Sequence, residues 1–200
     1  VTNSLFLARD HFGIKPVFYV QLAGGLAFST ELKTLAQIPG FDKTINAKSL
    51  VSSLNYLWVS GNETMFKGCN KLPAAHYLTY SKEGDMHMAR YWELEEPKLN
   101  SITNNEEAVK EELAKVLELS VKRHMVADVP VSCFLSGGLD SSLISVLAKK
   151  SNEHLSTYTI GTGDKDKAVE KMPDDEKYAA MLAAVHHFDH HVIKISPDII

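Results

Sequence analysis

The chain has 200 residues, 44% of them hydrophobic and 23% charged, and its formal net charge at pH 7 is -4. This composition is typical of a globular protein and excludes a disordered tail. Domains that neutralise nucleic-acid phosphates carry clustered Lys and Arg, so the acidic balance argues against nucleic acid as a partner. We expect no membrane partner, because no run approaches the roughly 18 consecutive apolar residues that a spanning helix needs.

The two cysteines, Cys69 and Cys133, are far apart in the sequence and belong to no CxxC pair. Two such residues are too few to staple a secreted scaffold, and the N-terminus lacks the basic and apolar regions of a signal peptide. We therefore expect a reducing, cytoplasmic setting. The chain starts at Val1 and enters directly into an apparent strand, so we expect a fragment of a longer protein.

In the first half of the chain, short apolar runs and alternating patterns predict strands, which lie at 5–8, 16–22, 25–30 and 75–80. Gly24 and Gly25 predict a tight hairpin between the second and third of these strands, since both turn positions can take a positive φ. Helical patterns occupy 29–38 and 46–59. This half is predicted to be α+β with an antiparallel sheet.

The polar, unpatterned stretch PKLNSITNN, residues 97–105, is typical of a linker. We place a domain boundary there, with one domain at 1–98 and a second at 104–200.

A long amphipathic helix is predicted over 104–126, where apolar residues recur at spacings of three and four. We expect a reciprocal cap at its start, formed either by Thr103 with Glu106 or by Asn104 with Glu107.

A strand at 129–135, a helix at 141–150 and a strand at 155–161 follow. A helix between two apolar strands is a βαβ unit, which predicts a parallel sheet with a right-handed crossover. The second half is thus predicted to be α/β.

The stretch SGGLDSS, Ser136–Ser142, lies between the first of these strands and its helix. Backbone N–H groups at a helix N-terminus have no intrahelical acceptor and lie at the positive end of the helix dipole, so they bind anions. Gly137 and Gly138 leave the backbone accessible, and the three serines add hydroxyl donors. The stretch is predicted to hold phosphate, although it matches neither the Walker A pattern nor GxGxxG.

Asp140 indicates a divalent cation at this site, because a carboxylate repels phosphate oxygens unless such a cation lies between them. Mg²⁺, a hard ion with oxygen ligands, suits that place, so we predict a magnesium pyrophosphate group. The alternative is an ordinary helix start in which Asp140 acts as the cap and the glycines form a turn. The strand before the loop and the apolar helix after it favour the phosphate site.

SGGLDSS resembles the SGGxDS pyrophosphate loop of the ATP pyrophosphatase superfamily, and the longer stretch MVADVPVSCFLSGGLDSSLIS is similar to the same region of glutamine-hydrolysing asparagine synthetases. The first half agrees independently. Its segments ARDHFGIKPVFY, AFSTELKTL, FKGCNKLPAAHYLTY and RYWEL resemble the later part of that family's glutaminase domain. Both motif sets stand in the family's order and together extend over nearly the whole chain.

The resemblance implies that 1–98 is the C-terminal part of a class II glutamine amidotransferase domain with an N-terminal-nucleophile hydrolase fold. It implies that 104–200 is the N-terminal part of an ATP-pyrophosphatase-like asparagine synthase domain. Ammonia from glutamine would pass to the second domain, where ATP activates the aspartate side chain as β-aspartyl-AMP and ammonia displaces AMP. The implied cofactors are ATP and Mg²⁺, the substrates are glutamine, aspartate and ATP, and a homodimer is left open.

Carried over residue by residue, the pyrophosphate would be held by Ser136, Gly137, Gly138, Leu139, Asp140, Ser141 and Ser142, with Asp140 reaching Mg²⁺. Leu135, at the end of the first strand, and Ile160, at the end of the second, would flank the adenosine by backbone and apolar contact. Both strand ends lie at the edge where open α/β sheets bind ligands.

The chain also departs from the family pattern. The glutaminase nucleophile is a Cys at the mature N-terminus, yet residue 1 is Val, and neither Cys69 nor Cys133 occupies such a place. No catalytic residue is therefore assigned, and we expect the polypeptide alone not to complete the reaction. Ala8 and Ala75 stand where the family usually has Gly.

Other readings of the loop are a related amidotransferase or a β-lactam-synthetase-like enzyme that adenylates a different carboxylate. A degenerate nucleotide-binding module is a third reading, and the intact SGGLDSS stretch argues against it.

Several polar clusters are interpreted as structural. Arg9, Asp10 and Lys15 are predicted to form a buried ion pair and a turn. The acidic run Met172–Ala179 is predicted to be a solvated helix start without a catalytic role.

The segment HHFDHH, His186–His191, places His187 and His191 four apart, which would suit zinc on one helix face. We predict instead that the segment leaves a helix for a strand, which separates the two side chains. Both cysteines are expected to be inert, and Trp58 and Trp92 are interpreted as core or interface residues.

Overall fold

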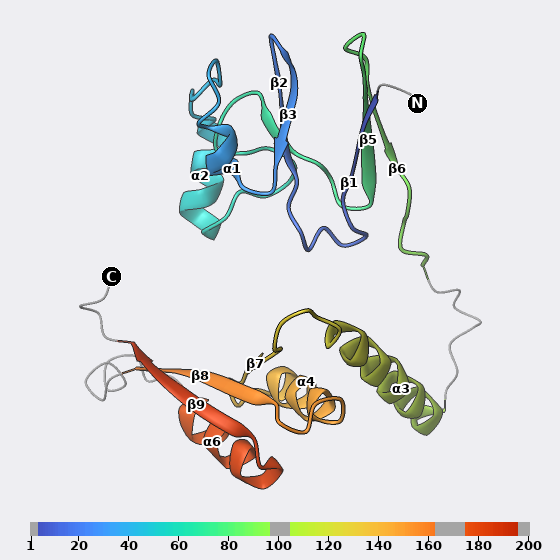
Figure 1. The fold of residues 1–200 in the computed structure, drawn as a ribbon, viewed down its shortest axis with the longest axis vertical. Helices are drawn as coiled ribbons and strands as arrows, with labels where there is room; N and C mark the ends of the chain where they lie inside the picture. The colour runs from blue at the N-terminus through green and yellow to red at the C-terminus, as the bar shows by residue number, and fades with distance from the viewer. Residues whose placement is uncertain (1–3, 97–104, 163–174, 196–200) are drawn as a thin grey trace. The chain divides into compact units, whose positions relative to one another are not determined.

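The computed structural model describes residues 4–96, 105–162 and 175–195. The chain divides into two compact units, Val1–Pro97 and Lys98–Ile200, and the strands of each unit pair only with one another (Figure 1). Each unit also has its own buried apolar residues.

Two antiparallel three-stranded sheets form the first unit, in the orders β1–β5–β6 and β3–β2–β4. The strands are β1 (Ser4–Ala8), β2 (Phe18–Leu22), β3 (Gly25–Ser29), β4 (Cys69–Lys71), β5 (His76–Ser81) and β6 (Met86–Arg90). The antiparallel character and the four predicted strands are confirmed. The sequence patterns did not predict β4 or β6.

The predicted hairpin joins β2 to β3, with Leu22 paired to Gly25. The hairpin is confirmed, but its two turn positions are Ala23 and Gly24. Gly25 is the first residue of β3 and, of the two glycines, the one with a positive φ, 132°. Two helices accompany the sheets, α1 (Leu32–Leu35) and α2 (Ala47–Tyr56). The side chain of Asn46 caps α2 by accepting hydrogen bonds from two backbone amides.

The two tryptophans differ in environment. Trp58 is 68% exposed, so it is not a core residue, and its assignment to an interface stays a prediction. Trp92 is half-buried and packs edge-on against His11, with ring centroids 4.8 Å apart.

A parallel sheet in the order β7–β8–β9 forms the centre of the second unit, as predicted. Its strands are β7 (Cys133–Phe134), β8 (Ser156–Thr162) and β9 (Asp189–Ile195), and its helices are α3 (Glu106–His124), α4 (Leu139–Lys149) and α6 (Asp175–His186). The strand predicted at 129–135 is much shorter in the structure, because only two of its residues pair with β8.

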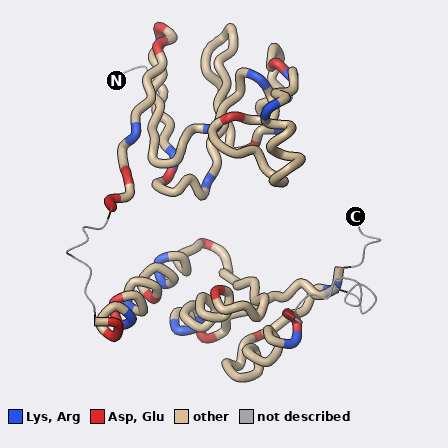
Figure 2. The backbone as a smooth tube through the Cα atoms, turned by 180° about the vertical axis from the view of Figure 1, so that it is seen from behind, with Lys and Arg blue, Asp and Glu red and all other residues tan. Residues whose placement is uncertain are grey.

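The N-cap of α3 is Asn105, whose side chain accepts a hydrogen bond from the amide of Ala108 at 3.2 Å. The predicted caps Thr103 and Asn104 lie outside the described residues. Figure 2 shows acidic residues in the first turn of α3 and basic residues in its last turn, the arrangement that suits the helix dipole. No helix among the described ranges has the length and apolar character needed to cross a membrane.

Buried and exposed residues alternate along β8. Thr157 and Thr159 are 0% and 2% exposed, whereas Ile160 is 55% exposed. Among the described residues of this unit, the buried apolar core contains Leu135, Ala148, Leu155, Ala179, Ala183 and Phe188. The sheet therefore has one face packed against helices, and the loop after β7 starts at the edge of that core.

Candidate functional site

The loop Ser136–Ser142 is anchored at its start by Leu135. The Leu135 side chain is 1% exposed, and its N–H donates to the Tyr158 carbonyl at 2.8 Å. Its own carbonyl accepts a hydrogen bond from the Thr159 hydroxyl. Because its side chain is buried in the core, Leu135 could contact a nucleotide through its backbone alone. The apolar contact that we predicted between the Leu135 side chain and the adenosine is not possible in this structure.

Gly137 is in contact with the first turn of α6. Its φ is 75°, a left-handed conformation that favours glycine. A Cβ atom at this position would lie 2.7 Å from the Tyr178 Cβ, 2.8 Å from the Ala179 nitrogen and 3.0 Å from the Asp175 oxygen. Gly137 is therefore required for the close packing of loop and helix, a reason that differs from ligand access.

Gly138 has a different environment. It is the N-cap of α4 with an extended backbone, φ -73° and ψ 162°. A Cβ atom there would meet only the Ser136 Oγ, at 3.4 Å. Of the two glycines, Gly138 is thus the one whose missing side chain leaves space beside the backbone.

The hydroxyls of Ser136 and Ser141 bond within the loop. The Ser141 Oγ lies 2.9 Å from the Ser136 Oγ, accepts from the Ser136 N–H at 3.2 Å and donates to the Gly138 carbonyl at 3.2 Å. These two serines were expected to donate to phosphate, but in this structure their hydroxyls hold the loop in shape.

The amides at the start of α4 remain as donors. The Ser142 N–H donates to the Gly138 carbonyl at 3.0 Å, which is the first turn of the helix. The amides of Leu139, Asp140 and Ser141 precede that bond, so they have no acceptor within the helix. These three N–H groups are suited to meet an anion.

Asp140 is exposed in the first turn of α4. Gly138 occupies the cap position and no side chain makes a capping hydrogen bond, so the alternative in which Asp140 caps the helix is wrong. Within the part of the chain that the structure describes, the Asp140 carboxylate makes no hydrogen bond or ion pair. One free carboxylate beside backbone donors fits Mg²⁺, which usually binds one or two carboxylates together with substrate phosphates.

Ile160 lies beside the loop, although it does not end its strand. The strand β8 continues to Thr162, one residue beyond the predicted strand at 155–161, so Ile160 is not its last residue. The pairing of β7 with β8 stops at Phe134 opposite Tyr158, and Ile160 therefore lies past the end of β7, where the chain has entered the loop. Its exposed side chain is available for apolar contact.

The first turn of α6 is a part of the site for which the sequence predicted no role. The acidic run was interpreted as a solvated helix start, and its residues 172–174 lie outside the described ranges. Glu176, in this turn, forms a two-oxygen contact with Lys194 at 2.7 and 2.8 Å. No local pattern could reveal this, because the partners come from a helix and a strand that meet only in the fold.

The turn at Arg9–Lys15 is closed on itself. The Asp10 carboxylate accepts from the amides of Phe12, Ile14 and Lys15 at 2.9–3.2 Å, and Arg9 donates to the carbonyls of Gly13, Lys15 and Leu72. The amides, chiefly that of Lys15, lower the pKa of Asp10. The predicted turn is confirmed, but the buried ion pair is wrong: Asp10 is exposed, and both charges are satisfied by the backbone.

The two cysteines have no features of an activated nucleophile. Cys69 is 1% exposed and Cys133 is half-buried, and both thiols are free. Burial raises the pKa of each thiol, which disfavours the reactive thiolate.

The histidines of HHFDHH do not share a helix face. The helix α6 ends at His186 and β9 begins at Asp189, with His187 between them at φ 52°. The predicted change from helix to strand is confirmed. His190 lies 3.0 Å from the Thr157 hydroxyl, whereas His191 stacks on Tyr158 at 5.1 Å.

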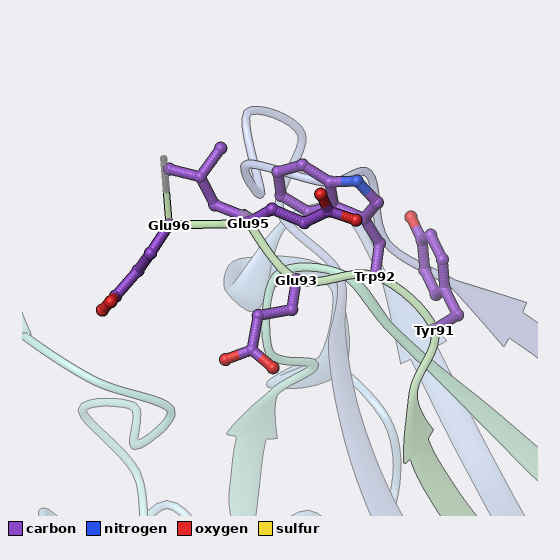
Figure 3. Close-up of a pocket in the computed structure, with 6 residues that line it drawn as sticks. Tyr91, Trp92, Glu93, Glu95 and Glu96 are labelled. Carbon is purple, nitrogen blue, oxygen red and sulfur yellow. The ribbon is translucent and has the colours of Figure 1, made fainter. Parts of the chain in front are cut away.

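A separate hollow lies along Tyr91–Glu96, the segment after β6 (Figure 3). Its acidic side chains do not converge, since Glu93 and Glu96 point in different directions in Figure 3. Among the described residues, no group of three His, Cys, Asp or Glu could hold a metal ion. This hollow therefore offers no site comparable to the loop.

Two family models match the chain in succession. The model described as a glutamine amidotransferase domain matches residues 1–92, and the model described as asparagine synthase matches residues 112–200. The two matches have the same order as the motif sets that carry the resemblance.

Individual relatives agree with this result. Glutamine-hydrolyzing asparagine synthetase 3 of Bacillus subtilis (strain 168) is 32% identical over 200 residues, which is 92% of this chain and 32% of the relative. A Mycobacterium bovis protein that carries the same name provisionally is 38% identical over 165 residues, 80% of this chain and 25% of the relative. Amidase chyE of Penicillium rubens is 34% identical over 142 residues, 70% of this chain and 20% of the relative. The chain thus spans a third or less of the length of these relatives.

Proposed function

Because the chain belongs to the family of glutamine-hydrolysing asparagine synthetases, we propose that the complete protein makes asparagine from aspartate, glutamine and ATP. In this proposal, 1–98 belongs to the glutaminase domain and 104–200 begins the synthetase domain. The observation that carries the proposal is the loop Ser136–Ser142, which presents backbone donors and one free carboxylate at the carboxyl end of a parallel strand.

The reaction needs an activation step, since a carboxylate is a poor electrophile and its oxygen is a poor leaving group. A side-chain oxygen of aspartate attacks the α-phosphorus of ATP, and pyrophosphate leaves with the electrons of the broken P–O bond. Ammonia then attacks the carbonyl carbon of β-aspartyl-AMP, loses a proton and displaces AMP. Mg²⁺, when bound, neutralises the charge of the departing pyrophosphate.

The residues of this chain bind and orient the nucleotide. The amides of Leu139, Asp140 and Ser141 donate to pyrophosphate oxygens, and the Asp140 carboxylate holds Mg²⁺. Gly138 leaves room for the phosphate to approach the backbone. The exposed side chain of Ile160 contacts the adenosine, and the backbone of Leu135 lies next to it.

Exchange of labelled pyrophosphate into ATP, measured with the complete protein, tests this proposal. We expect exchange that requires aspartate, and AMP as the nucleotide product with glutamine present. Asp140→Asn and Gly138→Val are each expected to reduce exchange at least about 100-fold, because the first removes the carboxylate that holds Mg²⁺ and the second adds a side chain that blocks the approach of phosphate to the backbone.

Glu118→Gln is the matched control, since Glu118 forms an exposed ion pair with Lys150 at 2.8 Å away from the loop. It is expected to keep the wild-type rate. Formation of ADP in place of AMP, or full exchange in Asp140→Asn, would contradict the proposal.

The acceptor carboxylate is a separate part of the proposal. The second candidate is a related amidotransferase or β-lactam-synthetase-like enzyme, in which the same adenylation acts on a carboxylate other than aspartate. Exchange assays with a panel of amino and keto acids distinguish the two. We also propose a cytoplasmic location. The oligomeric state is a separate question, and sedimentation of the complete protein decides between a monomer and a homodimer.

A further inference from the structure

The loop and the first turn of α6 form one packed unit. The backbone of Gly137 touches atoms of Asp175, Tyr178 and Ala179 so closely that a single added carbon would overlap them. Groups in such close contact cannot move independently, because a displacement of one would overlap the other. A shift of this turn would therefore move the loop.

Glu176 attaches the same turn to the sheet. Both of its carboxylate oxygens contact the Lys194 Nζ, at 2.8 and 2.7 Å. Lys194 lies on β9 directly beside Gly161 of β8 in the strand register. Glu176 thus joins the start of α6 to the carboxyl ends of two strands.

Gly161 makes the space in which this carboxylate lies. A Cβ atom at Gly161 would be 2.8 Å from the Glu176 Oε2 and 3.1 Å from the Lys194 Cδ. Any other residue would displace the carboxylate or the lysine. Glycine at position 161 therefore allows the Glu176 carboxylate to lie beside Lys194.

This ion pair is more enclosed than its counterparts in the same unit. The Glu176 side chain is 25% exposed, compared with 51% for Glu118 and 79% for Glu106 in their pairs with lysine. Exposed ion pairs contribute little to stability. A two-oxygen contact in a partly buried place fixes geometry more firmly than one on the open surface.

We propose that Glu176 is a positioning residue for the pyrophosphate loop. It acts through the first turn of α6 on Gly137, and Lys194 and Gly161 hold it in place. This inference rests on the proposed function, since it names a residue that sets the geometry of the proposed nucleotide site. Glu176 itself contacts no substrate in this arrangement.

Steady-state kinetics of Glu176→Gln and Lys194→Met in the complete protein test the inference. Each is expected to raise the KM for MgATP about tenfold with little change in kcat, because small displacements of positioning groups weaken binding of the group they position. The double variant is expected to lose less than the sum of the two single losses, because both substitutions remove the Glu176–Lys194 contact. Glu118→Gln, with Lys150→Met, is the matched control pair and is expected to leave KM unchanged.

Hydrogen exchange of residues 136–142 provides a readout that does not depend on activity. Glu176→Gln is expected to speed exchange in this loop and to leave exchange in Arg9–Lys15 unchanged. An unchanged KM together with unchanged loop exchange would overturn the inference. So would equal losses in MgATP binding and glutaminase rate accompanied by a fall in Tm, which would mark a general loss of stability.

The two proposals fail in different ways. If the wild-type protein shows no aspartate-dependent exchange of pyrophosphate into ATP, the proposed function is wrong. Hydrogen exchange of residues 136–142 then still decides whether Glu176 positions the loop. If the wild-type protein shows normal pyrophosphate exchange and Glu176→Gln changes neither the KM for MgATP nor the hydrogen exchange of the loop, only the further inference is wrong.

Discussion

Two turns of this protein contain glycine and aspartate, and they treat the acid in opposite ways. In Arg9–Lys15, the Asp10 carboxylate accepts hydrogen bonds from three amides of its own turn. In Ser136–Ser142, the Asp140 carboxylate has no such partner among the described residues, while two serine hydroxyls bond to each other. The two turns contain similar residue types. They differ in whether the backbone amides of the described residues donate to the aspartate carboxylate, as they do to Asp10, or leave it free, as they leave Asp140.

An aspartate whose carboxylate is satisfied within its own loop stabilises the fold, whereas an aspartate left free beside unpaired amides is available for a ligand. The same distinction applies to Gly137 and Gly138, since one is required by packing and the other leaves space. Three substitutions test these distinctions.

The largest effect on stability is expected for Gly137→Val. The substitution places a β-branched residue at φ 75° and a Cβ atom 2.7 Å from Tyr178, which together should cost about 3 kcal/mol. Urea unfolding of the complete protein, followed by a probe in the second unit, measures the loss. Gly138→Ala is the control and should change stability by less than about 1 kcal/mol, because its φ suits any residue; equal losses in the two variants would refute the distinction between the glycines.

A smaller loss is expected for Asp10→Asn, and it should depend on pH. The amides of Lys15 and Ile14 hold the pKa of Asp10 below its ordinary value of 3.8. A carboxyl group with a lowered pKa in the folded state contributes stability that is present above the unfolded pKa and is lost as pH falls through the folded pKa. The Tm difference between wild type and Asp10→Asn should therefore be constant from about pH 5 to 7 and shrink below about pH 4. A difference that does not change with pH would show that the carboxylate charge is not what the turn uses.

The smallest effect on stability is expected for Asp140→Asn. The substitution removes only a favourable charge at the start of α4, worth less than about 1 kcal/mol, although the same variant should lose pyrophosphate exchange. Thermal unfolding without nucleotide measures the change in stability, thermal unfolding with MgATP measures the loss of nucleotide binding, and the pyrophosphate exchange assay measures the loss of activity. A destabilisation as large as that of Gly137→Val would place Asp140 among the residues that serve the fold.

Much of the fold could be predicted because its signals are local. β1, β2, β3 and β5 have alternating or apolar runs, and the parallel sheet follows from a helix between two such runs. β4 has three residues and β6 reads MHMAR, so neither carries a clear period. The cap of α3 was missed because three neighbouring polar residues could each serve, and the structure selects Asn105.

The candidate site shows where sequence reasoning stops. The loop and Asp140 could be found from residue types at fixed spacing, and the family resemblance they support is confirmed by the comparisons. The different tasks of Gly137 and Gly138 could not be found, because they depend on α6, a helix that follows much later in the chain. The prediction of an ion pair between Arg9 and Asp10 was wrong for a similar reason. Opposite charges close in sequence suggest a pair, but backbone carbonyls bind the Arg9 side chain and backbone amides bind the Asp10 carboxylate.

Under the proposed function, the Ser136–Ser141 hydroxyl contact also affects the free energy of nucleotide binding. A loop already cross-linked by its own hydrogen bonds has few alternative conformers to give up when phosphate arrives, so the conformational entropy lost on association is small. Affinity for the phosphate tail can then come from the backbone donors without being offset by the cost of ordering the peptide around it.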